Sequence, residues 1–213
     1  MRRLGALLLA VFVTAAACGG SDATDESTAD AAGPASGPPP EWPAPPDPLE
    51  RTRAAGLEPE LHEQLQIHRH SHLDVFFNGD SVTVPAGVGI DISDPGVQSF
   101  DDPSGPAYGG IEECENPCIS PLHTHDETGI LHTESASDEL HTLGQFFVEW
   151  GVRLDEDCVD DYCTPETDIA VYVDGDRVSG DPADIELENE REIAIVIGSP
   201  PDDIPDTADF SQP

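Results

Sequence analysis

Histidine is the residue type in this sequence whose spacing points most directly to chemistry. All eight His lie between positions 62 and 141. His68, His70 and His72 occupy alternate positions, so on a β-strand their side chains leave the same face. Neighbouring members are then about 6.6 Å apart at the backbone, and two imidazoles can meet one ion at roughly 2.0–2.1 Å each. Because His68 and His72 are about 13 Å apart on a straight strand, one ion takes two of the three unless the strand bends at a bulge.

A second group of histidines follows further along the chain. His123 and His125 repeat the alternate spacing, and an antiparallel return after a short turn would bring His132 beside them. Asp126 and Glu134 are available to orient the ligating rings, and either would serve as a catalytic base if the protein is an enzyme. The sequence predicts metal ligands among six histidines: His68, His70, His72, His123, His125 and His132.

Residue chemistry narrows the choice of metal. Met1 is the only methionine, which excludes a thioether copper(I) site. Calcium prefers cages of oxygen ligands, and no spaced D-x-D-x-D-G loop is present. Imidazole-rich sets suit zinc, copper(II) or nickel. We expect zinc or copper(II) as the bound ion, held for capture, delivery or structural use.

Two other classes of function stay open. One is a metal-dependent hydrolase or redox enzyme with three histidines on the ion, although the cupin spacing is matched poorly and the H-E-x-x-H, G-x-S-x-G, Walker and dinucleotide motifs are absent. The other is an adhesion or interaction module whose histidines only titrate beside carboxylates near neutral pH. For His62 and His141 we expect hydrogen-bonded surface positions rather than metal ligation.

The elements that must position these residues are predicted to be strands and hairpins. Apolar alternation or continuous apolar runs predict strands over 66–77, 81–84, 129–134, 169–173 and 193–197. Asn78-Gly79 and Asp174-Gly175 are two-residue hairpin signals. Thr142 as N-cap and Gly151 as stop delimit one short amphipathic helix, and a further short helix is predicted within 49–66. We expect an α+β, mostly β domain of antiparallel hairpins with one short crossing helix.

The cysteines predict disulfide staples. Setting Cys18 aside as a modified residue leaves an even number, which suits an oxidising compartment. Their spacings do not match the tight C-x2-C knuckle of most structural zinc sites. Two disulfides are expected, with three connectivities open, among Cys114, Cys118, Cys158 and Cys163.

Charge excludes some partners. The chain has 44 Asp and Glu against 8 Arg and no Lys, for a formal net charge of −36. Nucleic acid and anionic membrane surfaces are excluded, because phosphate contacts need clustered Lys and Arg. The balance suits a cationic partner such as a divalent metal ion.

The N-terminal region predicts export. Residues 1–17 combine two Arg with an apolar stretch that ends in small residues, as in a signal peptide. Cys18 is the expected lipid attachment site, which would anchor the protein to the outer face of the cell membrane, with free secretion as the alternative. Residues 18–60 are predicted as a disordered Pro-rich tether and 61–199 as one domain. Residues 200–213 are predicted as a disordered acidic tail.

Several segments together resemble a family of uncharacterised bacterial secreted proteins. The resemblance is carried by the H-x-H-x-H run at 68–72, by His123-Thr124-His125-Asp126, by Gly129-Ile130-Leu131-His132 and by Leu143-Gly144-Gln145-Phe146-Phe147. It extends through residues 171–175 to Gly198. It implies that residues 61–199 form one unit, and it implies no activity.

Overall fold

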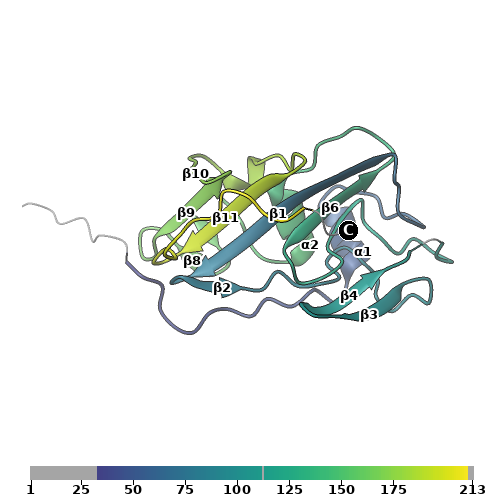
Figure 1. Cartoon of the computed structure of the whole chain (residues 1–213), viewed down its shortest axis with the longest axis horizontal. Coiled ribbons are helices and arrows are strands. Elements are labelled where there is room, and N and C mark those ends of the chain that lie inside the picture. Colours follow the sequence, from purple (N-terminus) through teal and green to yellow (C-terminus); the bar gives the residue numbers. More distant parts are fainter. Residues whose placement is uncertain (1–32, 112, 211–213) are drawn as a thin grey trace, which may run out of the picture.

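The computed structural model describes residues 33–111 and 113–210. Within these residues one sheet of seven strands has the order β10-β9-β11-β1-β6-β5, with β2 also paired to β1 (Figure 1). The strands are β1 (Ile67–Phe77), β2 (Asp80–Val82), β5 (Leu122–His123), β6 (Ile130–Ser135), β9 (Ile169–Val173), β10 (Asp176–Arg177) and β11 (Arg191–Ile197). Two separate ribbons pair β3 (Gln98–Asp102) with β4 (Gly105–Gly109) and β7 (Cys158–Val159) with β8 (Tyr162–Cys163).

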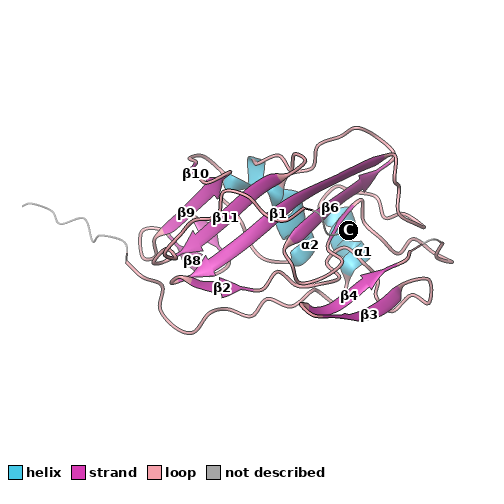
Figure 2. Cartoon of the chain, in the orientation of Figure 1, coloured by secondary structure: helices cyan, strands magenta, loops and turns pink. Residues whose placement is uncertain are grey.

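The predicted mostly β, α+β fold is confirmed. Figure 2 shows the helices α1 (Pro48–Ala54) and α2 (Leu143–Trp150) against one face of the sheet. A short 3-10 turn, η1, spans Pro182–Asp184. Most strand pairs are antiparallel, but β11 runs parallel to β1, with Leu73 opposite Ile193. A hairpin cannot join two parallel strands. The strands β2 to β10 and helix α2 therefore lie between β1 and β11 in the sequence.

Helix α2 forms where the sequence predicts it. The Thr142 hydroxyl accepts a hydrogen bond from the Gln145 backbone N–H, and the Gln145 side chain accepts one from the Thr142 backbone. Gly151 ends the helix in the left-handed conformation at φ 80°. Phe146, Phe147 and other apolar side chains of this helix pack on the sheet in the main core.

Strand β1 separates the core from the predicted metal ligands. Leu73, Val75 and Phe77 point into the core beneath α2 and are each about 1% exposed. The alternate positions, from His68 to Phe76, lie on the opposite face. At the far end of that face Phe76 packs with Ala194 and Val196. The histidines are therefore held by a strand that is fixed from below by the core.

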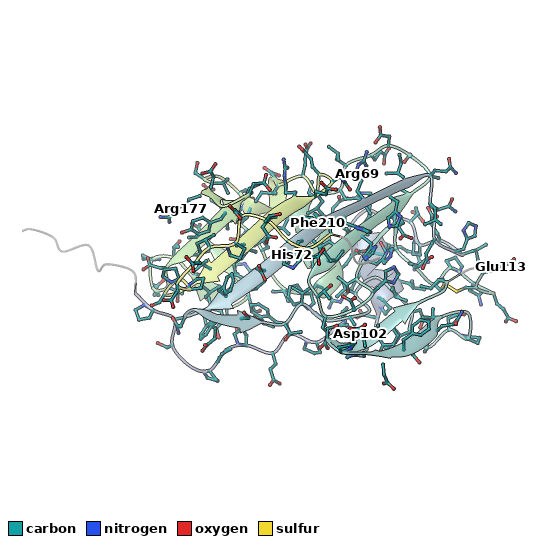
Figure 3. All side chains as sticks on the ribbon, in the orientation of Figure 1. Arg69, His72, Asp102, Glu113, Arg177 and Phe210 are labelled. Atoms are coloured by element: carbon teal, nitrogen blue, oxygen red, sulfur yellow. A yellow bond between two sulfur atoms is a disulfide. The ribbon has the colours of Figure 1, made fainter. Side chains whose placement is uncertain are left out.

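The predicted turns and disulfides are present. Asn78-Gly79 and Asp174-Gly175 have positive φ at both positions, as a type I′ hairpin turn requires. The disulfides join nearest neighbours in the sequence, Cys114–Cys118 and Cys158–Cys163. A disulfide is visible beside the labelled Glu113 in Figure 3.

Part of the predicted tether is packed on the domain. Trp42 lies edge-on to Trp150 with 5.7 Å between ring centroids, and the Trp150 indole N–H donates to the Trp42 carbonyl at 2.9 Å. Ala35 and Leu57 are buried in the main core. From residue 33 onward the expectation of a disordered tether therefore differs from the structure, because these apolar side chains bury surface against α2 and its neighbours. The predicted signal peptide at 1–17 and the predicted lipid attachment site Cys18 lie outside the described residues.

The described part of the C-terminal segment also differs from the predicted disordered tail. Ile204 packs on Phe76 and the β11 side chains on the face of the sheet opposite the helices. Figure 1 shows this segment crossing that face. Among the described residues, no helix combines the length and apolar character needed to cross a membrane.

Candidate metal centre

The strand register brings the two predicted histidine groups together. His70 on β1 lies opposite His132 on β6, and His132 lies opposite His123 on β5. One step along, His68 lies opposite Glu134. Cross-strand partners on one face have Cβ atoms about 4.5–5.5 Å apart, so their side chains share one space. We call this group the histidine centre; it consists of His68, His70, His123, His125, His132 and Glu134.

The tautomers of His123 and His125 are fixed by backbone carbonyls. The His123 Nδ1–H donates to the Ser120 carbonyl at 2.9 Å, and the His125 Nδ1–H donates to the Tyr108 carbonyl at 2.6 Å. A carbonyl oxygen can only accept, so each Nδ1 carries the proton and each Nε2 presents a lone pair. These two Nε2 atoms are 3.2 Å apart. Ligating histidines are commonly oriented by such a bond from the other ring nitrogen.

The other half of the histidine centre is built on β1. The Nε2 atoms of His68 and His70 are 2.8 Å apart, and Glu134 Oε1 is 3.3 Å from His68 Nε2. His132 lies between the halves, with its ring centroid 4.5 Å from that of His70 and 4.4 Å from that of His125. All five rings therefore belong to one continuous cluster.

Two buried polar atoms of the centre have no hydrogen-bond partner among the described residues. They are Nδ1 of His132 and Oε2 of Glu134, both in side chains that are 4% exposed. The closest ionic neighbour of His132 Nδ1 is Glu134 Oε1, at 3.7 Å, which is beyond hydrogen-bond distance. Buried polar groups without partners are costly, and a bound cation would satisfy both. The residues present therefore fit a metal ion.

Electrostatics keeps the buried rings neutral, which is the form that binds metal. Burial, and next the charge of His125, hold the pKa of His123 well below its ordinary value. Burial and the neighbouring histidines lower the pKa of His132 to about 2. Burial and the charge of His68 also lower the pKa of His70. These three rings are therefore free of a second proton at neutral pH.

Ligand atoms group in two overlapping sets within the centre. One donor atom each from His123, His125, His132 and Glu134 lies within 4.8 Å of the others. The same holds for His68, His70 and His132. The predicted metal ligands other than His72 are therefore brought together, and Glu134 lies among them rather than in an outer position.

His72 lies apart from the histidine centre. Its Nδ1 is 2.8 Å from Glu192 Oε2, and its Nε2–H donates to the Thr128 carbonyl at 2.9 Å. Although burial alone would lower the pKa of His72, the hydrogen bond and charge of Glu192, with that of Asp74, raise it above its ordinary value. His72 is therefore engaged with Glu192 and Thr128 rather than with the rings of the histidine centre. His72 lines a small pocket together with Ala208 and Asp209 of the C-terminal segment, and Figure 3 labels it beside Phe210 in this view.

Asp126 does not contact the imidazoles of the centre. Its carboxylate accepts hydrogen bonds from the backbone and hydroxyl of Thr128, which stabilises the turn before β6.

Of the two histidines expected at the surface, His62 is half-buried and its Nδ1–H donates to the Glu63 carbonyl. His141 differs from the expectation, since it is only 4% exposed and burial lowers its pKa.

Three acidic neighbours were missed by sequence reasoning. Glu63 Oε1 is 4.0 Å from His125 Nε2, and burial together with the charge of Glu134 raises the pKa of Glu63. Asp74 and Glu192 form a separate group with His72. Asp74 could have been found, because it continues the alternate series on β1. Glu63 and Glu192 carry no local signal, because only the tertiary fold brings them to these histidines.

A cavity of about 450 Å³ adjoins the histidine centre. Glu63, His125 and Asp126 are among the residues that line it. The β3–β4 ribbon contributes Tyr108 and the exposed Phe100. Solvent or a small molecule can therefore approach the centre from the side of His125.

Comparison with known proteins finds no relative, since no family model, curated protein or solved structure matches this chain. The resemblance to bacterial secreted proteins stays a prediction. Function is therefore inferred from the geometry of the histidine centre.

Proposed function

We propose that this protein is exported, is anchored through a lipid on Cys18, and binds zinc or copper(II) in the histidine centre for capture or delivery. Two disulfides between described cysteines suit an oxidising compartment outside the cytosol. All four of these cysteines are used in disulfides, so the available ligands in the described centre are imidazole and carboxylate. Such a set suits zinc and copper(II).

The observation that carries the proposal is the pair of facing lone pairs on His123 and His125. With both protons on Nδ1, no proton is left to form a hydrogen bond across the 3.2 Å gap between the Nε2 atoms. Two nitrogens bound at about 2.0–2.1 Å to one tetrahedral ion are separated by roughly 3.3 Å. The Nε2 separation is therefore close to what a shared cation needs. His132 and Glu134 supply two more donors to complete four-fold coordination.

Charge supports a role in cation capture. The net charge of −36 creates a field that attracts cations and repels anions. Attraction of this kind acts mainly on the rate of encounter, whereas the nitrogen ligands select transition metals over calcium and magnesium. The surface would therefore concentrate cations, and the centre would choose among them.

Metal retention tests the proposal. Protein produced without a polyhistidine tag, stripped with a chelator and then dialysed against zinc or copper(II), is expected to retain metal. The double variant His123→Ala/His125→Ala is expected to lose the ion bound between these rings. Copper(II) would add a visible absorption band, and the electron paramagnetic resonance spectrum of the loaded protein would show nitrogen hyperfine structure. A wild-type protein that retains neither metal would leave the interaction module with titrating histidines as the better account.

A metal-dependent enzyme is the second candidate, and the cavity beside His125 is what favours it. Asp126 and Glu63 line this cavity, so either carboxylate could act as a base on a substrate bound there. Glu134 is better placed as a ligand than as a base, because it lies within the ligand group. A coordination position open to an added small ligand, such as azide on the copper(II) form, would support the enzyme. A closed site would support storage or delivery.

A further inference from the structure

We propose that the histidine centre holds two transition metal ions, an inner ion between His123 and His125 and an outer ion between His68 and His70. This inference rests on the proposed function, since it assumes that the centre binds metal. It adds a stoichiometry, a division of ligands and a difference in exchange rate between the two positions.

The number of donors exceeds what one ion can use. A tetrahedral ion takes four protein ligands, and the set of His123, His125, His132 and Glu134 already provides four. The Nε2 atoms of His68 and His70 are then left over in the same cluster. With Glu134 Oε1 beside His68, these two imidazoles provide donors for a second ion.

Each pair of rings has the spacing of a chelating pair. The Nε2 atoms are 3.2 Å apart in the inner pair and 2.8 Å apart in the outer pair. Nitrogens on one ion at about 2.0–2.1 Å are separated by roughly 2.9 Å at a right angle and 3.3 Å at the tetrahedral angle. The inner separation lies within this range, and the outer separation lies just below its lower end.

His132 and Glu134 lie where the two positions meet. The His132 ring has close centroid contacts with His70 of the outer pair and His125 of the inner pair. Glu134 places Oε1 3.3 Å from His68 Nε2, while its buried Oε2 has no hydrogen-bond partner among the described residues. Glu134 belongs to the inner ligand group, and its Oε1 also lies beside His68 of the outer pair. A carboxylate that offers one oxygen to each of two ions can bridge them. We therefore assign Glu134 as the bridging ligand.

Burial makes the two positions unequal. The inner pair includes His123, which is fully buried, whereas the side chain of His68 in the outer pair is 41% exposed. An ion at the outer position is reached directly from solvent, so it should exchange faster with a chelator. The inner ion would be retained, and the outer ion would be the one delivered.

Copper(II) stoichiometry tests the inference. Untagged, metal-free protein is dialysed to equilibrium against copper(II), and copper per chain is measured by atomic absorption. We expect two ions in the wild type, one in His68→Ala/His70→Ala, and two in the matched control His62→Gln, whose residue lies outside both ligand groups. Circular dichroism checks that each variant is folded. The loaded wild type should also show spin coupling between neighbouring copper(II) ions, and the one-ion variant should show an isolated copper(II) spectrum.

The outcomes separate the two proposals. One ion in the wild type would overturn the two-ion centre and leave the proposed function intact. Two ions in both the wild type and a folded His68→Ala/His70→Ala variant would also overturn it. No bound copper or zinc at all would remove the proposed function as well. If the double variant fails to fold, the wild-type spectrum decides, because two uncoupled copper(II) signals contradict a shared bridge.

Discussion

Glu149 on α2 offers a quantitative test of the buried chemistry beneath the histidine centre. Its side chain is fully buried between α1 and the segment that leads into β5, and desolvation raises its pKa to about 8. The hydroxyls of Ser120 and Thr52 act in the opposite direction but only in part. Ser120 also accepts the hydrogen bond that orients His123. The Glu149 carboxyl group is therefore protonated at neutral pH.

Replacing Glu149 with Gln removes this titration and keeps the shape. Between pH 4.5 and pH 8 the folded protein holds a proton that the unfolded chain has lost, so the free energy of unfolding falls as pH rises. A shift of 3.5 pKa units, from 4.5 to about 8, corresponds to about 5 kcal/mol at 1.36 kcal/mol per unit. The gain of Glu149→Gln over the wild type should therefore grow by about 5 kcal/mol from pH 4 to above pH 8.

Urea unfolding at a series of pH values measures this difference directly. The amide of the new glutamine side chain adds hydrogen-bonding groups whose effect on stability does not depend on pH. The result is therefore the slope with pH of the difference in unfolding free energy, not its absolute size. The exposed Glu156→Gln makes the same chemical change at the surface and serves as the matched control. A wild-type minus Glu149→Gln difference that stays flat between pH 5 and pH 8 would show that Glu149 is not held protonated by burial.

Three further predictions concern stability and the support of the centre. His72→Gln should lower the free energy of unfolding by about 2 kcal/mol at pH 6 and by less at pH 9. A histidine whose pKa is raised by folding stabilises the folded state at any pH below its ordinary pKa, and this stabilisation is lost as the pH rises through the folded pKa. Equal losses at both pH values would contradict this. Gly89→Ala should weaken both folding and metal binding, since an added Cβ would be 2.6 Å from the Leu122 carbonyl at the start of β5. Gly180→Ala, which shares a positive φ but has nothing within 4 Å, should affect metal binding little; similar metal affinities for the two variants would count against a crowded backbone at β5. Replacing Cys114 and Cys118 with Ser should weaken metal retention more than replacing Cys158 and Cys163, because the Cys114–Cys118 disulfide packs in the small core beside the segment leading to β5. An equal loss of bound metal after dialysis in the two variants would contradict this.

Local pattern was enough to predict the position of most of the centre. Alternation placed His68 and His70 on one face of a strand, and the turn before β6 returned His132 beside His123, as the register shows. Both facts depend on residues near each other in the sequence. The convergence of the two groups needs only one long-range contact, the pairing of β1 with β6.

The parts that could not be predicted depend on contacts between distant residues. His72 leaves the centre because the parallel strand β11 places Glu192 opposite it, and β11 is far along the chain. The described part of the predicted tether is packed rather than disordered, because Trp42 contacts Trp150 on α2. The carbonyl that fixes the His125 tautomer belongs to Tyr108 on a separate ribbon. Periodicity carries no information about such partners.

Anomalous diffraction from crystals of the zinc-loaded or copper(II)-loaded protein would locate the bound ion in the histidine centre. Data collected on either side of the metal absorption edge locate the ion without assumptions about its ligands. We expect an anomalous peak at about 2.0–2.1 Å from the Nε2 atoms of both His123 and His125. Anomalous peaks found only at surface carboxylates, with none among the rings of the histidine centre, would contradict it.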